Sequence, residues 1–310
     1  MSHGRYRDLH AAQYGLSTVG NDCKWAATHP QEDTYTLDAC IYSLQYAVNN
    51  TQVFRGHNLC WGNDNPEWLT CGAPNDAVSN CNWTATDLER LLVDHIENVM
   101  HEVPAGGATI YAWDVVNEAI DYVTHQAWGL KNNTWYPTLP NYVDVAFTAA
   151  RQADPNALLC YNDYSAEGLS GKSDAVYDMV SSMITRGVPI DCVGFQLHVK
   201  YDAVPLRDDV SANIARLGDL GLVVHVTELD VTCPECYYYT TYDDDDGGNK
   251  QNNSGSGSRS SSSGGSRSSC GGGSSGSEPT ERRSSNWRLV GTLLSRCSRC
   301  SRCSRCSRCS

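Results

Sequence analysis

Apolar positions in the first 230 residues alternate between short continuous runs and repeats spaced three and four residues apart. The runs predict β-strands, and the repeats predict amphipathic helices. The clearest helix covers residues 87–101, with Thr84 or Thr86 placed to cap it. Its apolar face is formed by Leu88, Leu91, Leu92, His95, Ile96, Val99 and Met100.

The predicted elements follow one another in strict alternation. The strands are residues 16–21, 53–61, 109–117, 157–163, 191–199 and 222–231. The helices between them are residues 36–49, 87–101, 141–152, 172–186 and 208–219. Such alternation indicates parallel strands with right-handed helical connections, in an open doubly wound sheet or a closed barrel. No Gly-x-Gly-x-x-Gly follows any strand, which removes the main support for a nucleotide-binding open sheet.

Polar residues end five of the predicted strands. They are His57-Asn58, Asn117-Glu118, Asn162-Asp163, Gln196-x-His198 and Glu228-x-Asp230. Buried imidazoles and carboxylates are costly without partners, so their convergence on one face is typical of an active-site mouth. We therefore predict an α/β fold of the (β/α)8 TIM barrel type.

Two glutamates at distant strand ends suit a retaining glycosidase, in which one carboxylate attacks the sugar and the other protonates the leaving oxygen. A bend at the strand end can bring Asn117 and Glu118 to the same sugar. His198 lies in a strand expected beside that of Glu228, where an imidazole can orient the nucleophile. Asp230 is either the partner of that imidazole or a buried structural group.

The residues around both glutamates match known blocks. Trp113-Asp114-Val115-Val116-Asn117-Glu118-Ala119 resembles the acid/base strand of glycoside hydrolase family 10, and residues 226–231 resemble its nucleophile strand. Residues 21–25, 55–61, 161–164 and 187–198 are similar to its other blocks, in the same order. The resemblance extends over about residues 6–232 and implies a retaining endo-1,4-β-xylanase without metal or cofactor.

Residue by residue, the resemblance makes Glu118 the acid/base and Glu228 the nucleophile. It implies substrate binding by Asn21, Lys24, His57, Trp61, Asn117, Gln196 and His198. Trp25 and Trp113 are expected in the barrel core.

The chain departs from the family pattern at several positions. Gly20 stands where the family usually has Glu, and Gly62 stands where it commonly has His. An insertion between Cys71 and Cys81, and the segment 128–135, indicate altered loops around the substrate cleft.

Charge divides the chain into two parts. Residues 1–250 carry 13 Lys+Arg against 34 Asp+Glu, a net −21, whereas residues 251–310 carry 10 against 2, a net +8. The acidic part argues against nucleic acid or an anionic membrane as partner and is compatible with a neutral polysaccharide such as xylan. We expect a monomer.

Nine cysteines and three Asn-x-Ser/Thr sequons, at Asn49, Asn82 and Asn132, lie within residues 1–246. Together with the spacing of Cys71 and Cys81, they favour an oxidising, extracellular setting. Residues 1–7 lack the apolar core of a signal peptide, so we expect the signal to be missing from this sequence.

The barrel is expected to be incomplete. Strands 2–7 are recognisable within a hydrolase domain of residues 1–246, and the first and eighth strands are not. Residues 247–310 form a Ser/Gly/Arg/Cys tail that we predict to be disordered. Its Ser-Arg-Cys repeats are low-complexity sequence rather than a metal site, and Cys233 and Cys236 are expected to have a structural role.

Three functions therefore compete. The first is xylan hydrolysis, and the second is a catalytically impaired carbohydrate-binding relic, suggested by the incomplete barrel. The third is an interaction protein that acts through its basic tail. The intact Asn117-Glu118 and Glu228 favour the enzyme.

Overall fold

A computed structural model describes residues 3–104, 108–121 and 129–233 of the chain. Its main sheet consists of β1 (Leu16–Thr18), β2 (Val53–Trp61), β3 (Ala112–Asn117), β4 (Leu158–Asp163), β5 (Cys192–Phe195) and β7 (Val223–Val226). The strands pair in that order, and every pairing is parallel. The parallel sheet predicted from the alternating pattern is confirmed.

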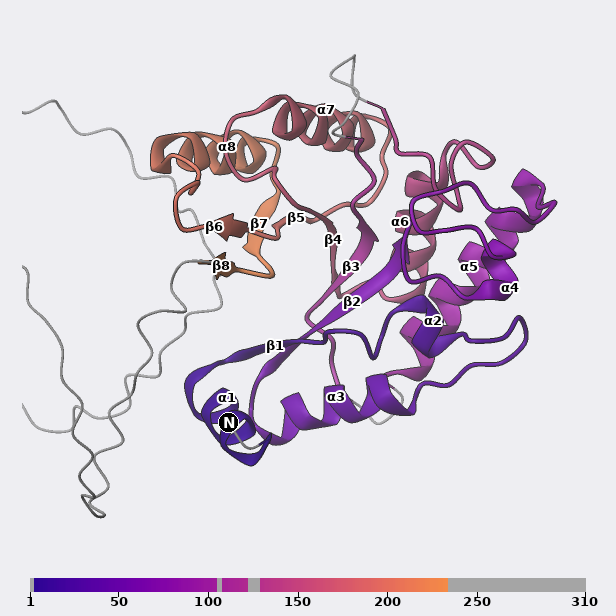
Figure 1. The fold of residues 1–310 in the computed structure, drawn as a ribbon, viewed down its shortest axis with the longest axis horizontal. Helices are drawn as coiled ribbons and strands as arrows, with labels where there is room; N and C mark the ends of the chain where they lie inside the picture. The colour runs from indigo at the N-terminus through magenta and orange to yellow at the C-terminus, as the bar shows by residue number, and fades with distance from the viewer. Residues whose placement is uncertain (1–2, 105–107, 122–128, 234–310) are drawn as a thin grey trace, which may run out of the picture. The chain divides into compact units, whose positions relative to one another are not determined.

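Helices connect the successive strands. They are α3 (Asp38–Asn49), α5 (Ala85–Glu102), α6 (Tyr142–Ala153), α7 (Gly171–Thr185) and α8 (Arg207–Asp219). Figure 1 shows these helices arranged around one side of the curled sheet, as in a barrel wall. The sequence pattern did not predict the helix α1 (His3–Gln13) or the short helices α2 (Trp25–Thr28) and α4 (Glu67–Thr70).

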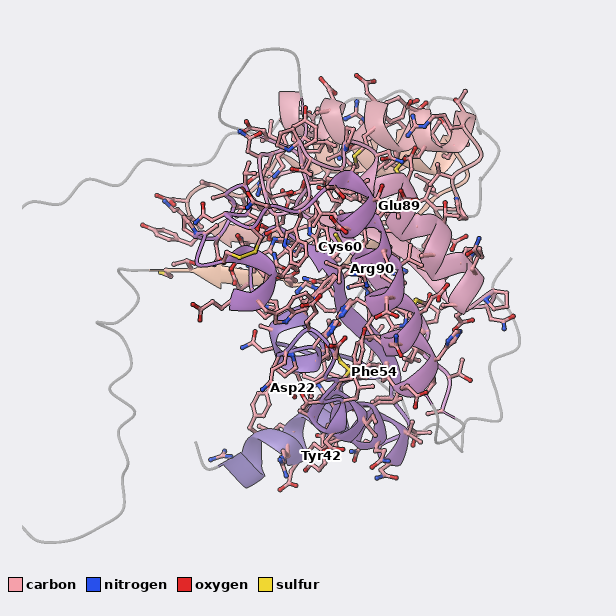
Figure 2. All side chains as sticks on the ribbon, turned by 90° about the vertical axis from the view of Figure 1, so that its right-hand side faces the viewer. Asp22, Tyr42, Phe54, Cys60, Glu89 and Arg90 are labelled. Atoms are coloured by element: carbon pink, nitrogen blue, oxygen red, sulfur yellow. A yellow bond between two sulfur atoms is a disulfide. The ribbon has the colours of Figure 1, made fainter. Side chains whose placement is uncertain are left out.

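Helix α5 shows why the sequence folds as predicted. Thr84 is its N-cap, and a capping box joins Thr84 to Asp87. All seven residues of the predicted apolar face are buried. Glu89 and Arg90, labelled in Figure 2, are exposed on the opposite side, whereas Phe54 and Cys60 of β2 lie in the interior.

Two predicted strands are each divided into two in the structure, and this corrects the sequence analysis. The strand predicted at 191–199 divides into β5 and β6 (His198–Lys200), and that at 222–231 divides into β7 and β8 (Asp230–Thr232). Leu197 takes a left-handed conformation with φ 63°, which breaks the first strand. The separated ends β6 and β8 pair in parallel as a small second sheet.

The core lies between the sheet and its helices. Trp113 and Trp25 are 1% and 2% exposed, as expected for core residues. Within the described residues, β1 and β7 are the edges of the main sheet, so the predicted strands 2–7 form an open, curved part of a barrel. The tail predicted at 247–310 and Cys236 lie outside the described residues. No helix in the described part has the length and apolar character needed to cross a membrane.

Candidate active site

Glu118 directly follows the buried strand β3, and its backbone turns there with φ 57°. The indole Nε1 of Trp61 donates to its Oε2 at 3.1 Å. Gln196 Nε2 and Asn117 Nδ2 donate to its Oε1 at 2.9 and 3.3 Å. The turn therefore brings Asn117 and Glu118 together, as predicted, and surrounds the carboxylate with N–H donors.

Glu228 lies between β7 and β8. Asn162 Nδ2 donates to its Oε1 at 2.7 Å, and the Nε2 atom of His198 lies 3.2 Å from its Oε2. The Glu228 side chain is 27% exposed. One amide and one imidazole thus fix the two carboxylate oxygens of the predicted nucleophile.

A short chain of amides links the two glutamates. Asn117 Oδ1 accepts from Asn162 Nδ2 at 2.9 Å and from Gln196 Nε2 at 3.3 Å. Asn162 also donates to Glu228, while Gln196 also donates to Glu118. The structure therefore places the two candidate catalytic carboxylates in one hydrogen-bonded network at the ends of β3, β4, β5 and β7.

Asn162 is held in a defined orientation, because Thr227 Oγ1 donates to its Oδ1 at 2.7 Å. Gly194 lies beneath this contact. A Cβ at Gly194 would lie 2.2 Å from Asn162 Oδ1 and 2.9 Å from Thr227 Cγ2, both too close. Only glycine at this position leaves room for the amide that joins the two halves of the site.

His198 bridges two carboxylates. Its Nδ1 lies 2.7 Å from Asp230 Oδ2, and its Nε2 faces Glu228. Burial opposes the charged imidazole, but the hydrogen bonds and charges of Asp230 and then Glu228 outweigh it and raise the pKa of His198. Asp230 is therefore the partner of the imidazole, the first of the two alternatives left open by the sequence.

His57 belongs to a second, fully buried ion cluster. Its Nδ1 lies 2.9 Å from Asp114 Oδ2, and the guanidinium of Arg55 makes two hydrogen bonds to the same carboxylate. Burial favours the neutral acid, yet Arg55 and His57 outweigh it and lower the pKa of Asp114. Because an ionised carboxylate only accepts hydrogen bonds, Nδ1 of His57 donates to Asp114, which fixes the orientation of the ring.

Of the residues expected on the glycone side, Lys24 lies next to Trp61. Lys24 Nζ lies 4.8 Å from the centre of the Trp61 ring and donates to Asp64 Oδ2 at 2.9 Å. Asn21 is exposed, and its carbonyl oxygen accepts from Lys24 N at 3.1 Å. Trp61 therefore contacts both residues: its ring faces Lys24, and its indole N–H donates to Glu118.

Sequence reasoning did not assign roles to Asn162 or to the buried pair Asp163 and Lys172, which are 2.6 Å apart. Burial raises the pKa of Asp163 and lowers that of Lys172. Asn162-Asp163 was recognised as a polar strand end, a signal that could have placed Asn162 in the site. Nothing in the local pattern indicates that Lys172, one residue into α7, reaches that carboxylate.

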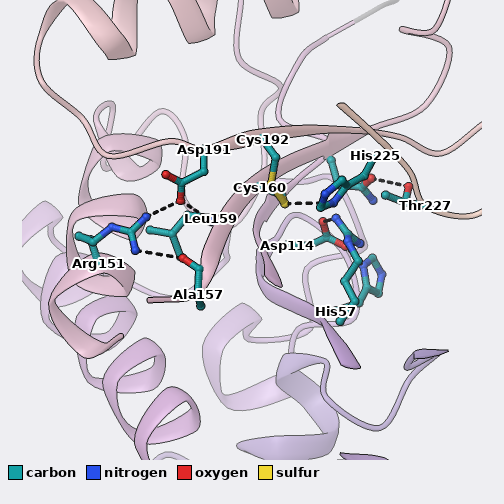
Figure 3. Close-up of a disulfide and its surroundings, with 12 residues drawn as sticks. His57, Asp114, Arg151, Ala157, Leu159, Cys160, Asp191, Cys192, His225 and Thr227 are labelled. Atoms are coloured by element: carbon teal, nitrogen blue, oxygen red, sulfur yellow. Dashed lines mark hydrogen bonds and ion pairs between the residues drawn. A yellow bond between two sulfur atoms is a disulfide. The ribbon is translucent and has the colours of Figure 1, made fainter. Parts of the chain in front are cut away.

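A buried disulfide joins β4 to β5 below the network. Figure 3 shows Cys160 bonded to Cys192, with His225 beside them and Asp114 and His57 nearby. His225 Nδ1 lies 3.7 Å from Cys160 Sγ. Burial, followed by the charge of Arg55, lowers the pKa of His225 to about 4. These three residues have the types and spacing of metal ligands, but both sulfurs are already used in the disulfide.

The sequence of the chain is similar to those of known proteins. The family model of glycosyl hydrolase family 10 matches residues 1–254. The chain belongs to this family. Endo-1,4-β-xylanase B of Thermotoga neapolitana is 33% identical over 228 residues, which are 73% of this chain and 61% of that enzyme. Endo-1,4-β-xylanase B of Neocallimastix patriciarum is 36% identical over 219 residues, 70% of this chain and 24% of that protein.

Solved structures of family 10 show the same fold. Xylanase 10B from Thermotoga maritima superposes with a TM-score of 0.68 at 33% identity, covering 77% of this chain and 70% of that one. Xylanase 10B from Thermotoga petrophila, in complex with xylobiose, gives 0.67 at 33% identity and covers 77% and 69%. The sheet described here is thus part of a family 10 (β/α)8 barrel, as the sequence predicted.

Proposed function

We propose that this family 10 chain is a retaining endo-1,4-β-xylanase. The observation that carries the proposal is the amide-linked pair of carboxylates, in which Glu118 and Glu228 share a network through Asn117 and Asn162. The xylanases that it resembles support xylan as the substrate. The chain spans 61% and 24% of the length of the two curated relatives, so the proposal for the whole protein rests on the geometry of the site.

The two glutamates suit the two steps of double displacement. Glu228 attacks the anomeric carbon while Glu118 gives its proton to the departing glycosidic oxygen. Glu118, now a carboxylate, then takes a proton from water as that water displaces Glu228. His198 keeps Glu228 oriented, and Asn117 is placed to bind the sugar 2-hydroxyl, a contact that strengthens in the transition state.

The stereochemistry of the first product tests this proposal. Proton NMR during hydrolysis of a xylo-oligosaccharide by the 310-residue protein should show the β-anomer first. An initial α-anomer would exclude double displacement. Sugar binding without any product would instead support the carbohydrate-binding relic.

We also propose that the protein is extracellular and monomeric. The disulfides Cys23–Cys40, Cys71–Cys81 and Cys160–Cys192 support an oxidising compartment. The sequon residues Asn49, Asn82 and Asn132 are all exposed, as glycosylation requires. Glycosidase-sensitive mass on the secreted protein, eluting at monomer size, is the expected result.

A further inference from the structure

An ammonium group lies between Glu118 and a second carboxylate. Lys131 Nζ is 3.7 Å from Glu118 Oε2 and 3.8 Å from Asp76 Oδ2. The Lys131 side chain is 12% exposed, and its ammonium also lies 5.3 Å from the centre of the Tyr164 ring. Among the described residues, Lys131 is the ion-pair partner of Glu118.

Backbone contacts hold Lys131 against the acid/base segment. Lys131 N donates to Ala119 O at 2.8 Å, and Ile120 and Leu130 form an antiparallel bridge. Residues 129–131 therefore fold back along residues 119–121. The position of the ammonium is thus fixed by the chain immediately after Glu118 and not by a freely moving surface side chain.

Asp76 reaches the same place from the loop closed by the disulfide Cys71–Cys81. Its N–H donates to Gly62 O at 3.2 Å, and its backbone has a left-handed φ of 54°. A Cβ at Gly62 would lie only 2.6 Å from Asp76 Oδ1. The glycine at 62, where the family commonly has a histidine, therefore leaves the space that the Asp76 carboxylate enters.

The groups around Lys131 keep its ammonium charged. Burial opposes the ammonium, but Asp76, Tyr164 and Glu118 outweigh it and raise the pKa of Lys131, so it stays charged around neutrality. The other charged groups that face Glu118 are Asp163 and Lys172, a buried pair that largely cancels, and His198 lies with Glu228 beyond the amides. Within the described residues, Lys131 is therefore the positive group in ion-pair contact with Glu118, and it shares that contact with Asp76.

We propose that Lys131 and Asp76 form a positioning pair that sets the protonation of the acid/base Glu118. The proposal rests on the proposed function and deepens it. Lys131 favours the Glu118 carboxylate that remains once its proton has moved to the leaving oxygen. Asp76 weakens that preference by neutralising part of the ammonium charge.

Direct titration of Glu118 tests the pair without requiring activity. The full 310-residue protein is labelled with ¹³C at the glutamate carboxyls, and the Glu118 resonance is assigned with Glu118→Gln. Lys131→Met should raise its titration midpoint by about one pH unit or more, because it removes an opposite charge within 4 Å. Asp76→Asn should lower the midpoint. Lys131→Arg, which keeps the positive charge that Lys131→Met removes, should return the midpoint to near its wild-type value. Arg186→Met, which removes a distant exposed cation paired with Asp144, should leave it unchanged.

Opposite shifts for Lys131→Met and Asp76→Asn are the expected result, with matching shifts of the alkaline limb of xylan hydrolysis. Midpoints that stay constant, or that move in the same direction, would overturn the proposal. Thermal unfolding checks each variant, and if Lys131→Met does not fold, the downward shift expected for Asp76→Asn still decides. If no variant, nor the wild type, hydrolyses xylan while the opposite shifts are present, the proposed function fails and the pair stands.

Discussion

The two candidate catalytic glutamates lie in parts of the sheet that are enclosed to different degrees. The strand β3, which leads to Glu118, is paired on both sides, and all six of its residues are buried. The strand β7, which leads to Glu228, is a sheet edge within the described residues, and the following β8 is exposed throughout. The side-chain exposure follows the same order, 13% for Glu118 and 27% for Glu228.

This difference indicates two kinds of support. Glu118 is placed by a central strand, and the ammonium group of Lys131 lies beside its carboxylate. Glu228 depends more on single side chains, chiefly Asn162 and His198, to hold its position. Changes around Glu118 should therefore alter pH dependence, whereas changes around Glu228 should alter the rate of sugar attack.

Removal of each glutamate should have the largest effect and separate the two roles. Glu228→Ala should lose about 10⁵-fold or more in turnover on every substrate, because no nucleophile remains. Glu118→Ala should still form the glycosyl-enzyme from a dinitrophenyl xylobioside, whose leaving group needs no acid. A burst of dinitrophenol measures this step. Equal losses for both variants on that substrate would mean that the roles are assigned wrongly.

The disulfide between β4 and β5 should stabilise the side of the sheet that carries Glu228. Replacing Cys160 and Cys192 with Ser opens a loop of 32 residues, and chain entropy predicts a loss of about 3–4 kcal/mol in unfolding free energy. Replacing Cys71 and Cys81, only 10 residues apart, should cost about 1 kcal/mol less. Urea denaturation of both double variants checks the order, and a larger loss for the 71–81 pair would contradict it.

Asn162 and Trp61 compare the two kinds of support directly. Asn162→Ala removes the donor to Glu228, and a displacement of about 1 Å should slow hydrolysis roughly a hundredfold. Trp61→Phe removes the N–H donor to Glu118 but keeps an aromatic ring near Lys24, so the loss should be within about tenfold. The ratio kcat/KM on a xylo-oligosaccharide measures both. A Trp61→Phe variant slower than Asn162→Ala would show that the central strand does not suffice to hold Glu118.

The smallest effect, a change in stability with pH, is expected for the exposed pair Asp230 and His198. Because Asp230 and Glu228 raise the pKa of His198 in the folded protein, its protonated form adds stability below pH 6.5 that is lost as pH rises through the folded pKa. Asp230→Asn should reduce this contribution, so the variant differs from wild type mainly at acidic pH. The 43% exposure of His198 screens the effect, and the proton NMR titration of its ring should show a lower midpoint. An unchanged midpoint would contradict the pairing.

Much of the fold could be predicted from the sequence because its signals are local. The seven positions on the buried face of α5 follow from helical spacing alone, whereas the structure decides for Thr84 between the two candidate caps Thr84 and Thr86. The ends of β5 and β7 could not be predicted, because apolar residues alternate with polar ones as far as Val199 and Val231, a pattern that a continuous strand also shows. The first strand ends where Leu197 takes a left-handed conformation, and β6 and β8 then pair with each other. Both features depend on contacts between residues that are far apart in the sequence.

The sequence by itself also determined the strand-end glutamates, the amide beside Glu118 and the family, because motif residues lie close together along the chain. Only the tertiary structure decided which groups surround them. Asn162 joins the two halves of the site by donating to Asn117 and Glu228, which are 45 and 66 residues away in the sequence. Asp76 reaches Lys131 because Gly62 leaves space for its carboxylate. Charge and packing act through distance in space, so the setting of each glutamate emerges only when strands and loops far apart in sequence are brought together.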